Sequence, residues 1–294
     1  MNILDDLKMQ YKIGDMTTRL IFWNIILFAV PEVVFSLLKL FNFHISYHDY
    51  VGLTNNPADL LLKPWTIISY SFFHANFFHL LFNMLMLNFA GKLFTTFFTQ
   101  KQLLGLYIMG GILGGIIYMA SYWFLPVLAG QSTLLVGASA SVMAILIATV
   151  TYQPYMNLRL ALIGNVKLWH IAIVFLFLDL IQLPLENTGG HLSHLGGALF
   201  GFIYIKALQN GTDLASGLNG MLDWFTMLFS PKKSTPFTKV HRNPKSANPT
   251  KTTGKIVTKD KTQQQIDEIL DKISKSGYDS LTADEKEFLF KAGK

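Results

Sequence analysis

The chain has 294 residues, of which 51% are hydrophobic and only 14% are charged. A soluble globular domain carries about 25% charged residues, so this composition excludes an ordinary soluble domain and favours an integral membrane protein. The net charge of +6 belongs to the end of the chain, because 14 of the 24 Lys and Arg residues follow Ser230. The absence of cysteine excludes disulfides, thiol nucleophiles and thiolate metal ligands.

Apolar windows of membrane-spanning length recur along the first two thirds of the chain. A bilayer core about 30 Å thick needs about 20 apolar residues per helix. Windows that approach this length fall at 19–41, 76–97, 102–125, 137–153, 168–185 and 191–208. The predicted fold class is therefore all-α integral membrane, a bundle of six transmembrane helices, with an interfacial loop at 42–75.

The cations predict how this bundle is oriented. Those that flank the predicted cytoplasmic ends are Lys8, Lys12, Arg19, Lys92, Lys101, Arg159, Lys167 and Lys206. The opposite loops 125–136 and 186–190 contain neither Lys nor Arg. This positive-inside bias predicts an N-in, C-in protein with a cytoplasmic C-terminal tail, so the short fourth window begins near the outer face.

The chain is expected to have four parts. Residues 1–18 are expected to form a cytoplasmic N-terminus and 19–210 a transmembrane domain. Residues 211–260 are an amphipathic and basic flexible linker, since 231–259 holds eight basic residues, four prolines and no acid. Such a linker is a solvated topology signal or, alternatively, contacts anionic lipid headgroups. Helical spacing and a capping-box pattern at Thr282 and Glu285 predict a small helical hairpin at 261–294.

Polar residues inside membrane spans are costly and are functional candidates by default. Those within the predicted spans are Glu32, His79, Asn83, Ser139, Ser141, Asp179 and His194. Hydrolysis of a peptide bond needs a nucleophile, a base and donors for the developing oxyanion. A serine, two histidines and an asparagine in this set supply those groups, whereas Glu32 and Asp179 are interpreted as structural partners of other polar groups.

Ser139 lies at the predicted start of the fourth span, in the segment Gly137-Ala138-Ser139-Ala140-Ser141. Unpaired amides and the helix dipole favour an anion there, which suits a nucleophile. Small residues are also ordinary packing residues where membrane helices meet, so this segment alone does not decide between the two roles.

His194 shares a helix face with a glycine strip in the sixth span. Gly197 and Gly201 follow it at i+3 and i+7, and the fourth span offers a matching seam of small residues at Ala140, Ala144 and Ala148. Packing these seams would place His194 beside Ser139. His191 competes for the role of base but lacks a glycine at i+3.

The second span carries two candidate oxyanion donors, His79 and Asn83, which lie at i and i+4 on one helix face. Hydrogen bonding between helices is the alternative role for this pair. His74 is interpreted as structural, because it would pin the preceding loop.

These residues together resemble the rhomboid family of intramembrane serine proteases. The resemblance rests on Pro64-Trp65-Thr66 through Phe73 to Met84, on Gly137-Ala138-Ser139-Ala140 and on His194-Leu195-Gly196-Gly197-Ala198-Leu199-Phe200-Gly201, and it covers roughly residues 15–210. It implies that Ser139 attacks, that His194 is the general base, and that His79, Asn83 and the Ser139 amide form the oxyanion hole. The glycines at 137, 197 and 201 and His74 are expected to support this site.

Two features depart from the family pattern. Met143 stands where many relatives place an aromatic ring against the catalytic histidine, so the orientation of His194 is less secured. The Trp-Arg pair common in the family's first loop is not evident between residues 42 and 63. Neither departure removes a chemical group.

The expected function is an intramembrane serine endopeptidase with a Ser-His dyad, which cleaves transmembrane or juxtamembrane segments of single-pass membrane proteins. The alternative is a catalytically silent rhomboid-like adaptor that binds membrane clients. A solute transporter would predict inverted repeats, which are not seen. A metal site of His74, His79, His191 and His194 would leave Ser139 unexplained. No metal, cofactor or nucleic acid is expected, and the expected location is the bacterial inner membrane.

Overall fold

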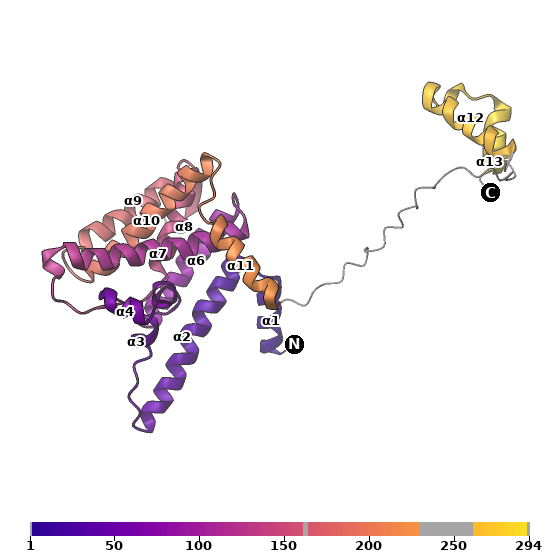
Figure 1. Cartoon of the computed structure of the whole chain (residues 1–294). Helices are drawn as coiled ribbons and strands as arrows, with labels where there is room; N and C mark the ends of the chain where they lie inside the picture. Colours follow the sequence, from indigo (N-terminus) through magenta and orange to yellow (C-terminus); the bar gives the residue numbers. More distant parts are fainter. Residues whose placement is uncertain (1, 161–163, 230–260, 293–294) are drawn as a thin grey trace, which may run out of the picture. The chain divides into compact units, whose positions relative to one another are not determined.

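The computed structural model describes residues 2–160, 164–229 and 261–292. The chain separates into two units, Met1–Lys232 and Lys233–Lys294, and both are built mostly of helices (Figure 1). The longer helices of the first unit are α1 (Ile3–Ile13), α2 (Met16–Leu40), α6 (Phe77–Thr95), α7 (Gln100–Phe124), α8 (Ser139–Tyr152), α9 (Leu168–Gln182), α10 (Thr188–Gln209) and α11 (Ser216–Phe229).

Three of these helices, α2, α6 and α7, are long and apolar enough to cross a membrane by length and composition. Two further apolar helices, α8 and α9, are shorter than a full span. A helix therefore lies in each of the six predicted windows, while the count of six spans and their orientation stay predictions.

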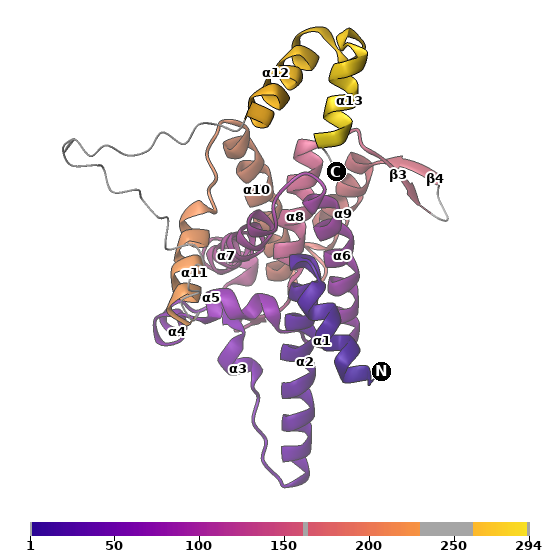
Figure 2. The ribbon, with the colours of Figure 1, turned by 90° about the vertical axis from the view of Figure 1, so that its right-hand side faces the viewer.

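Helix α8 lies inside the first unit, in contact with α6, α7, α9 and α10 (Figures 1 and 2). Ten of its 14 residues are buried. Small residues allow this close packing: a Cβ atom on Gly197 would overlap the Ala140 carbonyl oxygen, and one on Gly201 would overlap that of Ala144. The seam expected from the glycine strip is therefore present between α8 and α10.

Helix α2 packs differently from α8. Only Thr17, Leu20 and Asn24 are buried among its 25 residues, and all three lie in its first half. Asn24 Nδ2 donates to the Tyr107 hydroxyl of α7 at 3.2 Å. Most of the remaining apolar side chains are exposed, as lipid would allow.

The expected loop at 42–75 contains short elements. These are α3 (His48–Val51), β1 (Leu53–Thr54), α4 (Pro57–Leu62), α5 (Thr66–Ser69) and the 3-10 helix η1 (Tyr70–Phe72). Strand β1 pairs antiparallel with β2 (Leu134–Leu135), which follows the 3-10 helix η2 (Pro126–Leu128). The Gly137 amide donates to the Tyr70 carbonyl at 2.9 Å, which ties this segment to the start of α8. A second antiparallel pair, β3 (Asn157–Leu160) and β4 (Gly164–Lys167), joins α8 to α9.

The expected linker at 211–260 contains α11, an amphipathic helix that the linker interpretation did not include. Lys101 Nζ of α7 contacts Asp223 Oδ2 of α11 at 2.6 Å, so α11 packs against α7 within the first unit. The remainder of the expected linker, residues 230–260, lies outside the described residues.

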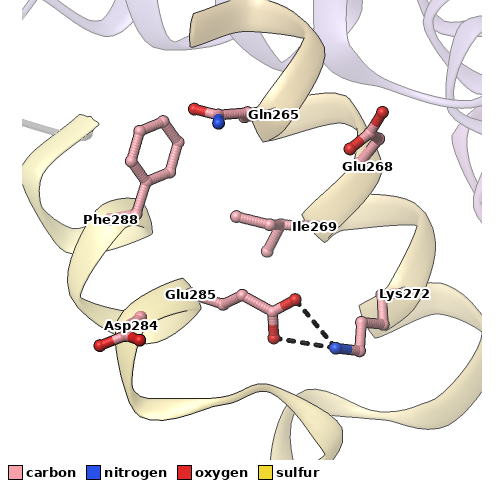
Figure 3. A pocket seen from close by; sticks show the side chains of 7 residues that line it. All are labelled: Gln265, Glu268, Ile269, Lys272, Asp284, Glu285 and Phe288. Atoms are coloured by element: carbon pink, nitrogen blue, oxygen red, sulfur yellow. Dashed lines mark hydrogen bonds and ion pairs between the residues drawn. The ribbon is translucent and has the colours of Figure 1, made fainter.

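The second unit holds α12 (Lys261–Ser276), the 3-10 helix η3 (Tyr278–Ser280) and α13 (Ala283–Ala292). Thr282 and Glu285 form a capping box, in which the Thr282 amide donates to Glu285 Oε2 at 2.7 Å and the Glu285 amide donates to Thr282 Oγ1 at 3.3 Å. Lys272 Nζ reaches both oxygens of Glu285 at 2.9 Å, beside a cavity of about 520 Å³ (Figure 3). This ion pair holds the Glu285 pKa below its ordinary value and joins α12 to the first turn of α13.

Candidate functional site

Ser139 and His194 meet across the α8–α10 seam. The Ser139 Oγ atom lies 2.6 Å from His194 Nε2, a hydrogen bond between side chains 55 positions apart in the chain. Ser139 is the first residue of α8, and His194 lies in the first half of α10. The glycines at 197 and 201 let the two backbones approach, which brings the predicted nucleophile and base together.

Gly137 shapes the turn before Ser139 in two ways. Its φ of +135° is a conformation that side-chain-bearing residues rarely adopt. In addition, a Cβ atom there would come within 2.7 Å of the His79 ring. The following residue, Ala138, is the N-cap of α8, and its side chain cannot accept a hydrogen bond from the first-turn amides. These amides therefore remain available to donate hydrogen bonds to an anion.

Asp179 joins the same site from α9. Its Oδ1 atom lies 2.8 Å from His194 Nδ1 and 2.7 Å from His191 Nδ1. Because a carboxylate only accepts hydrogen bonds, both Nδ1 atoms carry protons and His194 Nε2 is left to accept the Ser139 hydroxyl proton. Asp179 is therefore a structural partner of His191, as interpreted from the sequence, and it also contacts His194, for which the Ser-His dyad implies no carboxylate partner.

The ring of His191, from the same helix, packs against His194. The two imidazole rings meet edge to face, with centroids 5.6 Å apart and planes at 84°. Met143 lines the same cavity from α8. The signal that sequence reasoning underused was the spacing of His191 and His194, one helical turn apart, together with the buried Asp179 of the preceding helix.

His79 and Asn83 lie on one face of α6 and line the cavity that contains Ser139. The Ala75 amide donates to His79 Nδ1 at 3.4 Å, which leaves the proton on Nε2, one of the two ring atoms nearest to a Cβ placed on Gly137. Asn83 Nδ2 donates to the His79 carbonyl at 2.8 Å, and its second amide hydrogen remains for another acceptor. Their role as oxyanion donors stays a prediction.

His74 is fully buried just before α6. The Ala138 amide donates to its Nε2 atom at 3.5 Å, and its carbonyl accepts from His48 Nε2 at 3.2 Å. Burial, with a smaller contribution from His79, lowers the pKa of His74 to about 3. A neutral imidazole thus links the 42–75 segment to the turn before Ser139, in keeping with a structural role.

The site opens into a cavity of about 480 Å³. Its polar groups come from Ser139, His194, Asp179, His191, His79, Asn83, Gln182 and Glu186. Its apolar lining comes from α6 and α9, with Phe82, Met86, Phe175 and Leu178, and equally from α8 and the segment before it, with Leu135, Val136, Val142 and Met143. This combination suits a peptide segment whose backbone needs polar partners and whose side chains are apolar.

Comparison with known proteins identifies relatives of the transmembrane part. The chain is 31% identical over 155 residues to presenilin-associated rhomboid-like protein A, mitochondrial, of Danio rerio, covering 52% of this chain and 39% of the relative. It is 30% identical over 189 residues to presenilin-associated rhomboid-like protein, mitochondrial, of Rattus norvegicus, covering 60% of this chain and 46% of the relative. RHOMBOID-like protein 12, mitochondrial, of Arabidopsis thaliana is 25% identical over 190 residues, which cover 60% of this chain and 56% of the relative. The chain thus spans about half the length of these relatives.

These relatives correct two expectations. They are named as rhomboid-like proteins, and none of the names states a peptidase activity, so they favour client binding over the expected dyad endopeptidase of single-pass membrane proteins. They are also mitochondrial proteins by name, which contradicts the expected bacterial inner membrane.

Family models match two parts of the chain. A family of unknown function (DUF6576) matches residues 257–291, which include most of the helical hairpin. The Rhomboid domain matches residues 62–210, half of the chain, and this range includes α6 to α10 and every residue of the candidate site. On this match the chain belongs to the rhomboid family.

Proposed function

We propose that this rhomboid-family protein binds a segment of a membrane-protein client in the cavity beside Ser139. The observation that carries the proposal is the cavity itself, about 480 Å³ in volume, which is lined by apolar side chains of α6, α8 and α9 together with polar groups of α6, α8, α9 and α10. Backbone amides of an unwound client segment need hydrogen-bond partners at membrane depth, and this cavity supplies them. Binding of this kind does not require cleavage.

The proposal includes the membrane topology. The six helices of the predicted spans, α2 and α6 to α10, would cross the bilayer with both ends of the chain on the cytoplasmic side. The flanking cations support this orientation. The basic residues of 231–259 support a second contact, with anionic lipid headgroups. The start of α8 would then lie toward the outer face, where a client segment and water enter.

One observation favours a second candidate function, serine hydrolysis of the bound segment. Ser139 Oγ, His194 Nε2 and Nδ1, and Asp179 Oδ1 form a continuous hydrogen-bonded series at 2.6 and 2.8 Å. In this candidate, His194 removes the Ser139 proton as the hydroxyl attacks a carbonyl, and Asp179 stabilises the imidazolium that forms. The same proton then passes from His194 to the leaving amine.

Site-specific photocrosslinking tests client binding. A photoreactive residue at Leu178, in the cavity lining, is expected to capture a subset of single-pass membrane proteins presented to the full chain in nanodiscs. The matched control is the same residue at Ile26, which is 52% exposed on α2. Equal capture at both positions, or none at Leu178 across a broad panel, would refute binding in this cavity.

Cleavage of the captured clients tests the second candidate separately. If the site hydrolyses peptide bonds, Ser139→Ala and His194→Ala abolish cleavage without abolishing capture, and Asp179→Asn slows it by about 10²-fold or more. Cleavage that survives in Ser139→Ala would exclude serine chemistry. Capture without cleavage in the wild-type protein would leave client binding as the function.

A further inference from the structure

The three side chains of Asp179, His191 and His194 converge from two helices. Within the described residues, they form a set of three His or acidic side chains whose ligand atoms all lie within 4.8 Å of one another. Asp179 and His191 are buried, and His194 is partly exposed toward the cavity. The Oδ1 atom of Asp179 is the common point, at 2.7 and 2.8 Å from the two Nδ1 atoms.

This donor set matches a known preference of divalent transition metals. Two imidazole nitrogens and one carboxylate oxygen bind Zn²⁺ at about 2.0 to 2.2 Å, with a fourth position left for water. Tetrahedral ligands at that radius lie about 3.3 Å apart. The observed separations of 2.7 and 2.8 Å therefore require the Asp179 carboxylate to retract by about 0.5 Å.

We propose that Asp179, His191 and His194 form a binding site for a divalent transition-metal ion such as Zn²⁺, held by Asp179 Oδ1 and by the Nδ1 atoms of both histidines. The fourth position faces the cavity, because Asp179, His191 and His194 all line it. Helix spacing favours the site, since His191 and His194 lie one turn apart on α10 and present their rings on the same side.

Metal binding would change the hydrogen bond to Ser139. With the ion on Nδ1, the proton of a neutral His194 moves to Nε2, which then donates to Ser139 Oγ across the existing 2.6 Å contact. In that tautomer His194 cannot accept the serine proton. A bound ion would therefore prevent His194 from acting as the base for Ser139. This consequence rests on the second candidate function, whereas metal binding itself rests on neither proposed function.

Cobalt titration tests the site. Co²⁺ added to the metal-free full chain in detergent is expected to give visible d–d absorption that saturates at one equivalent and disappears when Zn²⁺ is added. His191→Asn and Asp179→Asn should each raise the Kd for Co²⁺ by more than about 10-fold, because each removes a ligand. Circular dichroism of both variants checks that they remain helical.

Two further variants separate this site from the proposed functions. Ser139→Ala keeps all three ligands and is expected to bind Co²⁺ like the wild type, even though it removes the nucleophile. His44→Ala removes an exposed histidine away from the site and should also leave the titration unchanged. Wild-type protein that gives no saturable, zinc-sensitive spectrum, or a His191→Asn variant with unchanged Kd, would overturn the proposal whatever the result of the client experiments.

Discussion

Helices α8 and α2 are both strongly apolar, yet most residues of α8 are buried in the bundle and most residues of α2 are not. Ten of the 14 residues of α8 are buried, with glycines of α10 against its backbone carbonyls. Only three of the 25 residues of α2 are buried. In a bilayer, apolar side chains gain little by leaving lipid, so close packing comes from small residues and polar contacts. Hydrophobicity therefore places a helix in the membrane, while small residues determine where the helices pack closely.

The largest effect is expected from filling the α8–α10 seam. Gly197→Val should destabilise the first unit by at least about 3 kcal/mol, because its Cβ would overlap the Ala140 carbonyl oxygen and the helices must separate. The free energy of unfolding in mixed micelles measures this loss. Gly217→Val is the matched control, since a Cβ at Gly217 meets no atom within 4 Å. Equal stability of the two variants would mean that the seam is looser than described.

A pH effect of intermediate size is expected from His74, which packs against the start of α8. Its pKa is about 3 in the folded protein and about 6.5 when exposed, so the unfolded state binds the proton first as the pH falls. Below pH 6.5, the free energy of unfolding should therefore fall by about 1.4 kcal/mol for each pH unit until the folded-state pKa is reached. The loss at pH 5 is about 2 kcal/mol. Unfolding at pH 7 and pH 5 measures it. His74→Gln should lose this component of the pH dependence, and a parallel pH dependence in both proteins would contradict the assignment.

A smaller effect is expected at the turn before Ser139. Gly137→Ala should cost about 1 to 3 kcal/mol from backbone strain and should displace the His79 ring, which lies 2.7 Å from the new Cβ. Gly130→Ala shares the positive φ but meets no atom within 4 Å, so it isolates the strain. Unfolding free energies give the difference, and the NMR signal of His79 reports its displacement. An unmoved His79 signal in Gly137→Ala would refute the contact.

The smallest effect is expected on the open part of α2. Ile26→Ala should change the free energy of unfolding by less than about 0.5 kcal/mol, because the side chain is 52% exposed on a helix that is long and apolar enough to cross a membrane. Leu20→Ala on the same helix should cost about 2 to 5 kcal/mol, since Leu20 is fully buried. If both cost the same, the contrast between α2 and α8 would fail.

Local spacing was enough to anticipate part of the site. The glycines at i+3 and i+7 from His194 and the alanine seam of α8 predicted which faces meet, and the Cβ overlaps at Gly197 and Gly201 show that they do. The capping box of Thr282 and Glu285 could also be predicted from the sequence, because its two hydrogen bonds join residues only three positions apart. The short helices of the 42–75 segment were not predicted, since runs of four to six residues carry little periodicity.

By itself, the sequence determined the membrane class and the helical windows, because these depend on composition and on spacing within one helix. The pairing of Ser139 with His194 was predicted from matching small-residue faces on two helices, and the packing of α8 against α10 brings the two side chains together. Only the tertiary structure decided the role of Asp179, which reaches His194 and His191 from a different helix. A helix turns by about 100° per residue, so a partner on a second helix depends on its rotation and crossing angle. The sequence left His194 without an evident support, and the packing of α9 against α10 supplied it.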